Sequence, residues 1–316
     1  MSASNGQQKI VVGLGELLWD MLPDGPRLGG APANFGVMAG RLGDHAAIAS
    51  RVGSDRLGRQ ARGELNALPV DTSWLQLDED HATGTVTIVL DYGEPHYTFQ
   101  EPVAWDRMEL TPQWLELARS ADAVCFGTLA QRDAQSRQTI LGFLDATRPE
   151  CVRIADVNLR APFWSGEVLR QSLQRATVLK LNIHEMPEVL RATRICAQAA
   201  MPNHDDEILH GARQLLECYP LQLVCVTIGS EGSMLVTREE SHRHRGRPVV
   251  VRDTVGAGDA FTAALTHYYL EGAPLAVLNE AGNRWGAWMA SQRGAMPPMR
   301  ADMVRDMSEE IRLLSA

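Results

Sequence analysis

A short segment at 253–261 combines glycines, a helix start and a carboxylate, residue types that together suit phosphate chemistry. Its sequence is D-T-V-G-A-G-D-A-F, and the small residues at 256–258 would let the backbone come close to a ligand. An apolar run follows, so a helix is predicted to begin here, and free N–H groups at a helix start attract anions. Asp259 would lie beside that anion and could accept a hydroxyl proton. The segment predicts phosphoryl transfer to an alcohol, with a glycine turn before a core helix as the alternative.

A second candidate site lies at 29–34, where the sequence reads G-G-A-P-A-N. Gly29 and Gly30 would let the backbone pack against a polar ligand, and Asn34 offers both a donor and an acceptor. These properties suit a polyol, although Asn and Pro are equally common where a loop caps a helix.

Both segments resemble the two signature motifs of the ribokinase-like, or PfkB, family of carbohydrate kinases. The resemblance implies that Asp259 is the catalytic base. It places the amides of the family's anion hole at Gly256, Ala257 and Gly258. It places the sugar contacts at Gly29, Gly30 and Asn34. The stretch G-E-L-L-W-D at 15–20 resembles a fructokinase motif whose aspartate binds sugar hydroxyls, which implies that role for Asp20.

The sequence D-V-N-L-R at 156–160 is similar to a segment shared by fructokinases and 2-keto-3-deoxygluconate kinases. The resemblance implies that Asn158 lies near the nucleotide phosphates and Arg160 near the phosphates or the substrate. Arginine suits polyphosphate recognition, and the alternative for Arg160 is a solvated surface charge.

The sequence K-L-N-I-H-E at 180–185 contains an N-x-x-E motif of the same family. The resemblance implies that Asn182 and Glu185 organise the water shell of a Mg²⁺ ion beside the nucleotide, with Lys180 and Asn182 on the nucleotide side. Mg²⁺ prefers oxygen ligands and retains waters, so an amide and a carboxylate can serve through water. Pro187 is expected to interrupt a helix here.

The sequence T-I-G-S-E-G at 227–232 resembles the nucleotide loop of the family. Nucleotide contacts are thereby implied for Thr227, Gly229, Gly232 and Asn283. A hairpin with two glycines is an equal alternative for the loop. Family members often bind a monovalent cation such as K⁺ through a carboxylate that corresponds to Asp253. Pro298 here replaces a serine that is common near that cation, so activation by K⁺ is left open.

The composition, 45% hydrophobic and 22% charged over 316 residues, is that of an ordinary globular protein. A net charge of −9 disfavours nucleic acid as a partner. Neither a signal peptide nor an apolar run of the ~20 residues that a membrane helix needs is found. Five cysteines without a C-x-x-C pair favour a reducing compartment, so a cytoplasmic location is expected. The two lysines follow no P-loop, and the basic run at 242–247 is expected to be a solvated connection.

Hydrophobic periodicity predicts an α/β fold, with a buried strand at 9–15 and a helix at 32–42. From 111 onward strands and helices alternate, as in a parallel sheet covered by helices. Strands are expected at 121–126, 152–157, 178–181, 221–228 and 233–237. Helices are expected at 114–119, 134–147, 166–175, 205–217, 257–270, 275–290 and 301–314. Ligands bind beyond the carboxyl ends of such strands, where several of the motifs fall.

Two alternating runs, at 83–91 and 96–100, predict exposed strands joined by a turn near 92–95. Together with the segment 16–30, which reads as irregular, the region 83–106 is expected to form a small β-sheet lid inserted in a single domain over 1–316. The resemblance implies the ribokinase-like three-layer α/β/α sandwich with a mostly parallel central sheet. An exposed edge of the lid could pair two chains in a homodimer.

The resemblance extends from about 15 to 298 and implies ATP-dependent phosphorylation of a sugar's primary hydroxyl with Mg²⁺. G-G-A-P-A-N favours fructose as the sugar. The alternatives are a 2-keto-3-deoxygluconate, ribose or nucleoside kinase, or a non-catalytic sugar or nucleotide sensor on this fold. One departure is F-Q-E-P-V-A-W-D at 99–106, where Glu101 and Trp105 stand in place of residues common in fructokinases. The lid is therefore expected to admit a different sugar.

Overall fold

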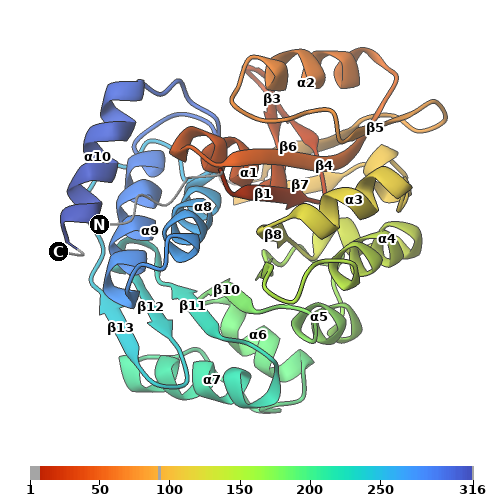
Figure 1. Ribbon diagram of the computed structural model, residues 1–316. Coiled ribbons are helices and arrows are strands. Elements are labelled where there is room, and N and C mark those ends of the chain that lie inside the picture. Colours follow the sequence, from red (N-terminus) through yellow and green to blue (C-terminus); the bar gives the residue numbers. More distant parts are fainter. Residues whose placement is uncertain (1–7, 92–93, 315–316) are drawn as a thin grey trace.

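The computed structural model describes residues 8–91 and 94–314, which form a sheet of nine strands and a sheet of four (Figure 1). The large sheet has the order β13-β12-β11-β10-β9-β8-β1-β4-β5. Its strands are parallel from β5 to β11, and β12 and β13 continue it antiparallel. The strands are β1 (Ile10–Leu14), β4 (His45–Gly53), β5 (Leu75–Asp78), β8 (Ala123–Phe126), β9 (Val152–Asp156), β10 (Val178–Asn182), β11 (Leu223–Thr227), β12 (Ser233–Val236) and β13 (Ser241–His244).

Successive side chains of each central strand enter opposite cores, because a strand has a period of two. Val12 packs in one core and Val11 in the other. The first core is covered by α3 (Pro112–Ser120), α4 (Ala134–Asp145), α5 (Gly166–Leu173), α6 (Glu185–Ala192) and α7 (Asp205–Cys218). The second is covered by α1 (Ala31–Leu42), α8 (Ala257–Leu270), α9 (Leu275–Ala290) and α10 (Ala301–Leu313). Figure 1 shows these two groups of helices on opposite sides of the sheet, which confirms the expected three layers.

The small sheet has the order β3-β2-β6-β7 and consists of β2 (Leu18–Leu22), β3 (Gly25–Gly29), β6 (Gly84–Asp91) and β7 (Glu94–Phe99). The expectation that 16–30 is irregular is wrong, because β2 and β3 pair there as a regular hairpin. This hairpin fills the connection between β1 and α1, so the small sheet stands beside the carboxyl end of β1. The turn expected near 92–95 includes residues 92 and 93, which lie outside the described residues.

Two further expectations about elements are wrong. Pro187 lies in the first turn of α6, where its missing N–H leaves no helical bond unmade, so the helix continues through it. The basic run at 242–247 is not a solvated connection, because it forms part of β13 and its side chains make ion pairs. Arg243 contacts Asp205 at 2.9 Å, and His244 contacts Glu280 at the same distance.

The segment between α1 and β6 contributes β4, α2 (Arg56–Asn66) and β5, for which the sequence analysis made no prediction. Short 3₁₀ turns occur at η1 (Ala104–Arg107), η2 (Leu129–Gln131) and η3 (Gly229–Glu231). In the part of the chain that the structure describes, no helix has the length and apolar character needed to cross a bilayer.

Candidate active site

The segment 253–261 forms a loop that leads directly into α8, as its sequence predicts. Gly256 caps the helix with φ 77°, and a β-carbon there would lie 2.8 Å from Ala295, so glycine is required. Within the described residues, the N–H groups of Gly258 and Asp259 donate no hydrogen bond to the protein, whereas that of Ala257 donates to the Thr254 carbonyl at 3.2 Å. The helix start therefore presents unused donors, but Ala257 is not one of them.

Asp259 lies next to Asn34, although 225 residues separate them in sequence. Asn34 belongs to the first turn of α1, which packs against α8, and its Nδ2 donates to Asp259 Oδ2 at 2.7 Å. Oδ1 of Asp259 accepts no hydrogen bond among the described residues, and the residue remains partly exposed. One carboxylate oxygen is thus held in place while the other is free to accept a proton.

Burial raises the pKa of Asp259 to about 6, and the nearby charge of Asp156 adds to the rise. The hydrogen bond from Asn34 opposes it, as does the charge of Lys180. A pKa in this range keeps the carboxylate ionised at neutral pH while making it a stronger base than an exposed aspartate.

A buried ion pair lies under the start of α8. Lys180 Nζ contacts Asp156 Oδ1 at 3.1 Å, and Thr262 Oγ1 donates to Asp156 Oδ2 at 3.1 Å. Burial disfavours the charged lysine, but the surrounding carboxylates outweigh it and raise the Lys180 pKa. A β-carbon on Gly258 would lie 3.0 Å from Lys180 Nζ, so the lysine supports the glycine loop from beneath. Asp156 was not among the predicted site residues, although its place at the end of β9 beside Lys180 could have indicated it.

The residues predicted to bind sugar come from the hairpin of β2 and β3, the start of α1 and the loop after β9. Asp20 lies on β2, and a β-carbon on Gly29 would approach its Oδ2 to 2.9 Å. Gly30 has φ 110°, and a β-carbon there would lie only 2.4 Å from the Glu16 carbonyl. Burial raises the pKa of Asp20, and the charge of Arg160 opposes this rise, as it opposes the rise at Asp259.

Glu16 is a site residue that the sequence analysis missed. Its carboxyl group is buried, and Oε2 has no hydrogen-bond partner among the described residues. Burial raises its pKa to about 7, and the charge of Asp259 contributes to the rise. Its position directly before the strand that carries Asp20 was the available signal.

The N-x-x-E motif forms a capping box at the start of α6. Asn182 Oδ1 accepts from the N–H groups of His184 and Glu185 at 2.9 and 3.0 Å. Glu185 accepts in return from the N–H groups of Asn182 and Leu159, both at 2.8 Å. Asn158, which precedes Leu159, has a left-handed φ of 38°. The motif therefore joins the ends of β9 and β10, and it leaves Asn182 Nδ2 available for a ligand.

A groove of about 1180 Å³ extends from the glycine loop across the carboxyl ends of β10 and β11. Most of the residues predicted to contact a nucleotide line it, namely Lys180, Asn182, Thr227, Gly229, Gly232 and Asn283. Gly229 and Gly232 also close the turn between β11 and β12, so the loop is a hairpin with two glycines, and its contact with a nucleotide stays a prediction. Asn283 Nδ2 is engaged with Ser233 Oγ at 2.7 Å. Arg243 and Arg247 line the groove as well and were not predicted to do so.

Asp253 connects the glycine loop to the segment after α9. Its Oδ1 accepts from Val255 N at 3.1 Å and its Oδ2 from Gly294 N at 3.0 Å. Arg27 Nη1 lies 3.8 Å from the same Oδ2. The described residues contain no cluster of three or more His, Cys, Asp or Glu side chains suited to hold a metal ion.

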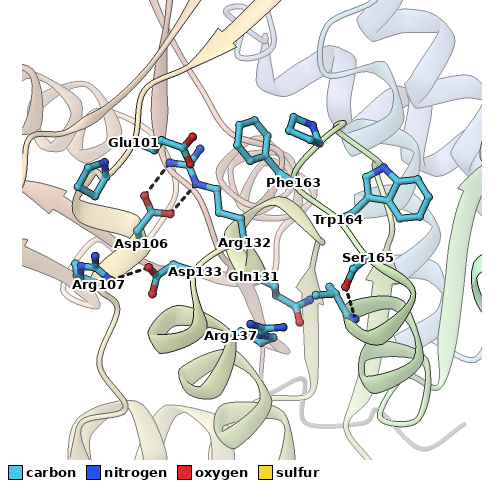
Figure 2. Close-up of a pocket in the computed structure, with 13 residues that line it drawn as sticks. Glu101, Asp106, Arg107, Gln131, Arg132, Asp133, Arg137, Phe163, Trp164 and Ser165 are labelled. Carbon is cyan, nitrogen blue, oxygen red and sulfur yellow. Dashed lines mark hydrogen bonds and ion pairs between the residues drawn. The ribbon is translucent and has the colours of Figure 1, made fainter.

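The departure at 99–106 lies partly away from this site. Trp105 is only 1% exposed and packs in the core, so its ring is not open to a ligand. Glu101 is exposed and borders a separate pocket of about 500 Å³ between the end of β7 and the starts of α4 and α5 (Figure 2).

A family model described as pfkB family carbohydrate kinase matches residues 26–302. The chain belongs to the pfkB family of carbohydrate kinases. Fructokinase from Klebsiella pneumoniae is 34% identical over 260 residues, covering 80% of this chain and 81% of that protein.

Two solved structures, of a sugar kinase and of a fructokinase, resemble the chain over most of its length. A sugar kinase from Pyrococcus horikoshii in complex with ATP has a TM-score of 0.79 and 28% identity, covering 96% of this chain and 99% of that one. Fructokinase from Vibrio cholerae with bound fructose, ADP and calcium ion has a TM-score of 0.73 and 27% identity, covering 92% and 95%. The predicted family and fold are therefore confirmed, and the chain is a sugar kinase of the pfkB family.

Proposed function

We propose that this pfkB kinase transfers the γ-phosphoryl group of ATP to the primary hydroxyl of a sugar, with Asp259 as the general base. The observation that carries the proposal is that the two oxygens of the Asp259 carboxylate have different surroundings. Asn34 holds Oδ2 at 2.7 Å, and Oδ1 is free beside the unused N–H groups at the start of α8. A base and an anion-binding helix start at one place suit attack by a hydroxyl on a phosphate.

The sugar would bind between β2 and the loop after β9. Asp20 and Arg160 supply an acceptor and a donor for its hydroxyl groups, and the bare backbone of Gly29 and Gly30 allows close approach. Asp259 then accepts the hydroxyl proton as the oxygen attacks, while the amides of Gly256 and Gly258 attract the charge that develops on the phosphoryl oxygens. The N–H of Ala257 is not free to contact the phosphoryl group, because it donates to the Thr254 carbonyl.

The nucleotide would occupy the groove of about 1180 Å³, with its phosphates toward Lys180 and Asn182, whereas Asn158 does not line this groove. Asn182 offers only its Nδ2, a donor suited to a phosphate oxygen, because its Oδ1 caps α6. Glu185 retains free lone pairs and fits the hydration shell of a Mg²⁺ ion, whereas Asn182 does not. The ion, when bound, would neutralise phosphate charge. Binding of a monovalent cation at Asp253 stays a prediction. A comparison of turnover in potassium chloride with turnover in choline chloride tests it.

We propose fructose as the preferred acceptor, supported by the G-G-A-P-A-N motif and by the fructokinases among the similar proteins. An assay of ADP formation with fructose, ribose, 2-keto-3-deoxygluconate and a nucleoside tests this choice. Turnover with fructose at the highest kcat/KM is expected. Higher kcat/KM for another acceptor would reassign the substrate, and binding without ADP from any of them would indicate a sensor.

We propose that the small sheet acts as a lid within one catalytic domain. It carries Asp20 and Gly29, so its position decides whether the sugar site is complete. Its edge strands β3 and β7 could also pair two chains, and light scattering in solution tests for the resulting homodimer.

A further inference from the structure

We propose that Arg132 is a positioning residue that holds the base of the small sheet against the loop carrying Arg160. This inference rests on the proposed function, because its consequence is the placing of the sugar. The residues concerned come from three separate segments: the chain after β7, the turn η2 and the loop after β9. Figure 2 shows Asp106, from the first of these segments, and Phe163, from the third, on the two sides of the Arg132 side chain.

The first contact of Arg132 is with the chain after β7. Nε and Nη2 donate to the two carboxylate oxygens of Asp106 at 2.8 and 2.7 Å, and Nη2 also donates to the Gln100 carbonyl at 2.7 Å. Asp106 Oδ2 in turn accepts from the N–H of Val103 at 3.0 Å. The side chains of Arg132 and Asp106 are only 5% and 3% exposed. A single guanidinium thus fixes the backbone at the base of the small sheet.

The second contact of Arg132 is with aromatic rings on both sides of the junction. Its guanidinium carbon lies 3.9 Å from the ring centroid of Trp105 and 5.0 Å from that of Phe163. Phe163 meets Phe99, the last residue of β7, edge to face at 5.4 Å. The N–H of Phe163 donates to the carbonyl of Arg160 at 2.8 Å. The loop that carries the sugar-binding arginine is therefore tied to the small sheet through Arg132.

Only a planar cation can serve both contacts at once. A guanidinium makes two parallel bonds to a carboxylate while its faces stack on aromatic rings, whereas an ammonium is a compact point charge. Arg132→Lys would keep the charge but lose the geometry. The small sheet and the Arg160 loop would then no longer be held in a fixed relative position. Binding of the sugar should therefore weaken, whereas binding of ATP in its groove should not change.

The experiment compares Arg132→Lys with Arg175→Lys. Arg175 makes the same two-pronged contact with Asp145, at 2.7 and 2.9 Å, away from the small sheet. We expect Arg132→Lys to raise KM for the sugar roughly tenfold or more, to leave KM for ATP unchanged and to form ADP in excess of sugar phosphate. Arg175→Lys should change none of these.

Equal effects of the two variants, or a parallel loss for sugar and ATP, would overturn the proposal. Asp106→Asn serves as a second variant if Arg132→Lys does not fold, and it should give the same split between the two KM values. Amide hydrogen exchange provides a readout that needs no turnover: exchange in β6 and β7 should become faster in Arg132→Lys and not in Arg175→Lys. If the wild type made no sugar phosphate, the proposed function would fail, yet this exchange test would still decide the role of Arg132.

Discussion

Asp259 and Glu16 are two carboxylic acids of the candidate site, and each has a pKa above its ordinary value. Burial is the main cause for both, because a charged carboxylate loses hydration inside the protein. The charge of Asp259 adds to the rise at Glu16, and the charge of Asp156 adds to the rise at Asp259. The two groups should therefore titrate near neutrality, in the range where activity is measured.

The pH dependence of kcat/KM should reveal Asp259. A protonated Asp259 cannot accept the hydroxyl proton, so kcat/KM is expected to fall as the pH drops through about 6, the pKa of the carboxyl group. Initial rates between pH 5 and 8 with sugar below KM provide the measurement. A flat profile over this interval would contradict the assignment of Asp259 as the base.

Glu16→Gln should stabilise the protein, and only toward higher pH. The folded-state pKa of Glu16 is about 7 against an ordinary value of 4.5, so the unfavourable ionisation in the folded state develops as the pH rises from 4.5 to 7 and is complete above it. Removing the charge should raise the free energy of unfolding by up to about 3 kcal/mol at pH 8.5 and by little at pH 5.

Thermal melting at the two pH values measures this difference. Glu116→Gln, a change at an exposed position on α3, is the matched control and should have no pH-dependent effect. A Glu16 variant less stable than the wild type at pH 8.5 would show that the carboxylate makes a favourable contact when ionised.

Single residues of the site were predictable where local sequence alone decides their place. The glycines of 256–258 and Asp259 follow from their motif, since a helix start needs no distant partner. The contact of Asn34 with Asp259 joins positions 225 apart, and no spacing in the sequence reports it. The burial of Trp105 was not predictable for the same reason, because its ring packs against Arg132 from another segment.

At the scale of elements, the start of α6 combines a helix cap with a proposed contact to the nucleotide. The Asn182 side chain caps the helix through Oδ1, and the residue lines the groove proposed for ATP. Two variants should separate these functions. Asn182→Asp retains an oxygen that can cap the helix, but it places a negative charge where phosphates are expected.

We expect Asn182→Asp to raise KM for ATP with little change in stability. Asn182→Ala should raise KM as well and also lower the free energy of unfolding by about 1 kcal/mol, the usual value of an N-cap. Steady-state kinetics and thermal melting measure the two effects. If Asn182→Asp left KM for ATP unchanged, the amide would have no role toward the phosphates.

The elements themselves were predictable in proportion to their regularity. The alternation after 111 gives most strands and helices, because buried parallel strands and their covering helices have clear periods. The prediction that Pro187 interrupts a helix was wrong, because proline breaks a helix only beyond its first turn. The prediction of a solvated connection at 242–247 was wrong, because its basic side chains pair with Asp205 and Glu280, which lie far away in sequence.

For the whole molecule, the site lies where the two sheets meet. Asp20 and Gly29 come from the small sheet, and Asp259 and Lys180 from the large sheet and its helices. The order of strands in the large sheet could not be read from the sequence, because it depends on the pairing of β1 with β4 on one side and β8 on the other. That order is what brings Glu16, Asp156 and Asn182 to one edge.

Sugar binding should accordingly stabilise the folded chain as a whole. Fructose at one hundred times its Kd should raise the free energy of unfolding by about 2.7 kcal/mol, because it binds only the folded state. Differential scanning calorimetry measures the shift, with the same concentration of fructose added to Asp20→Asn as the control. A similar shift in both proteins would mean that Asp20 does not contact the sugar.

The most direct measurement is rapid-quench kinetics of Asp259→Asn with ATP and fructose, together with Kd values for both ligands. Asparagine keeps an oxygen that can accept the hydrogen bond of Asn34, so the site should remain formed. We expect the phosphoryl-transfer rate to fall by about 10²- to 10⁴-fold while both Kd values stay unchanged. A transfer rate near that of the wild type with intact binding would show that Asp259 is not the base.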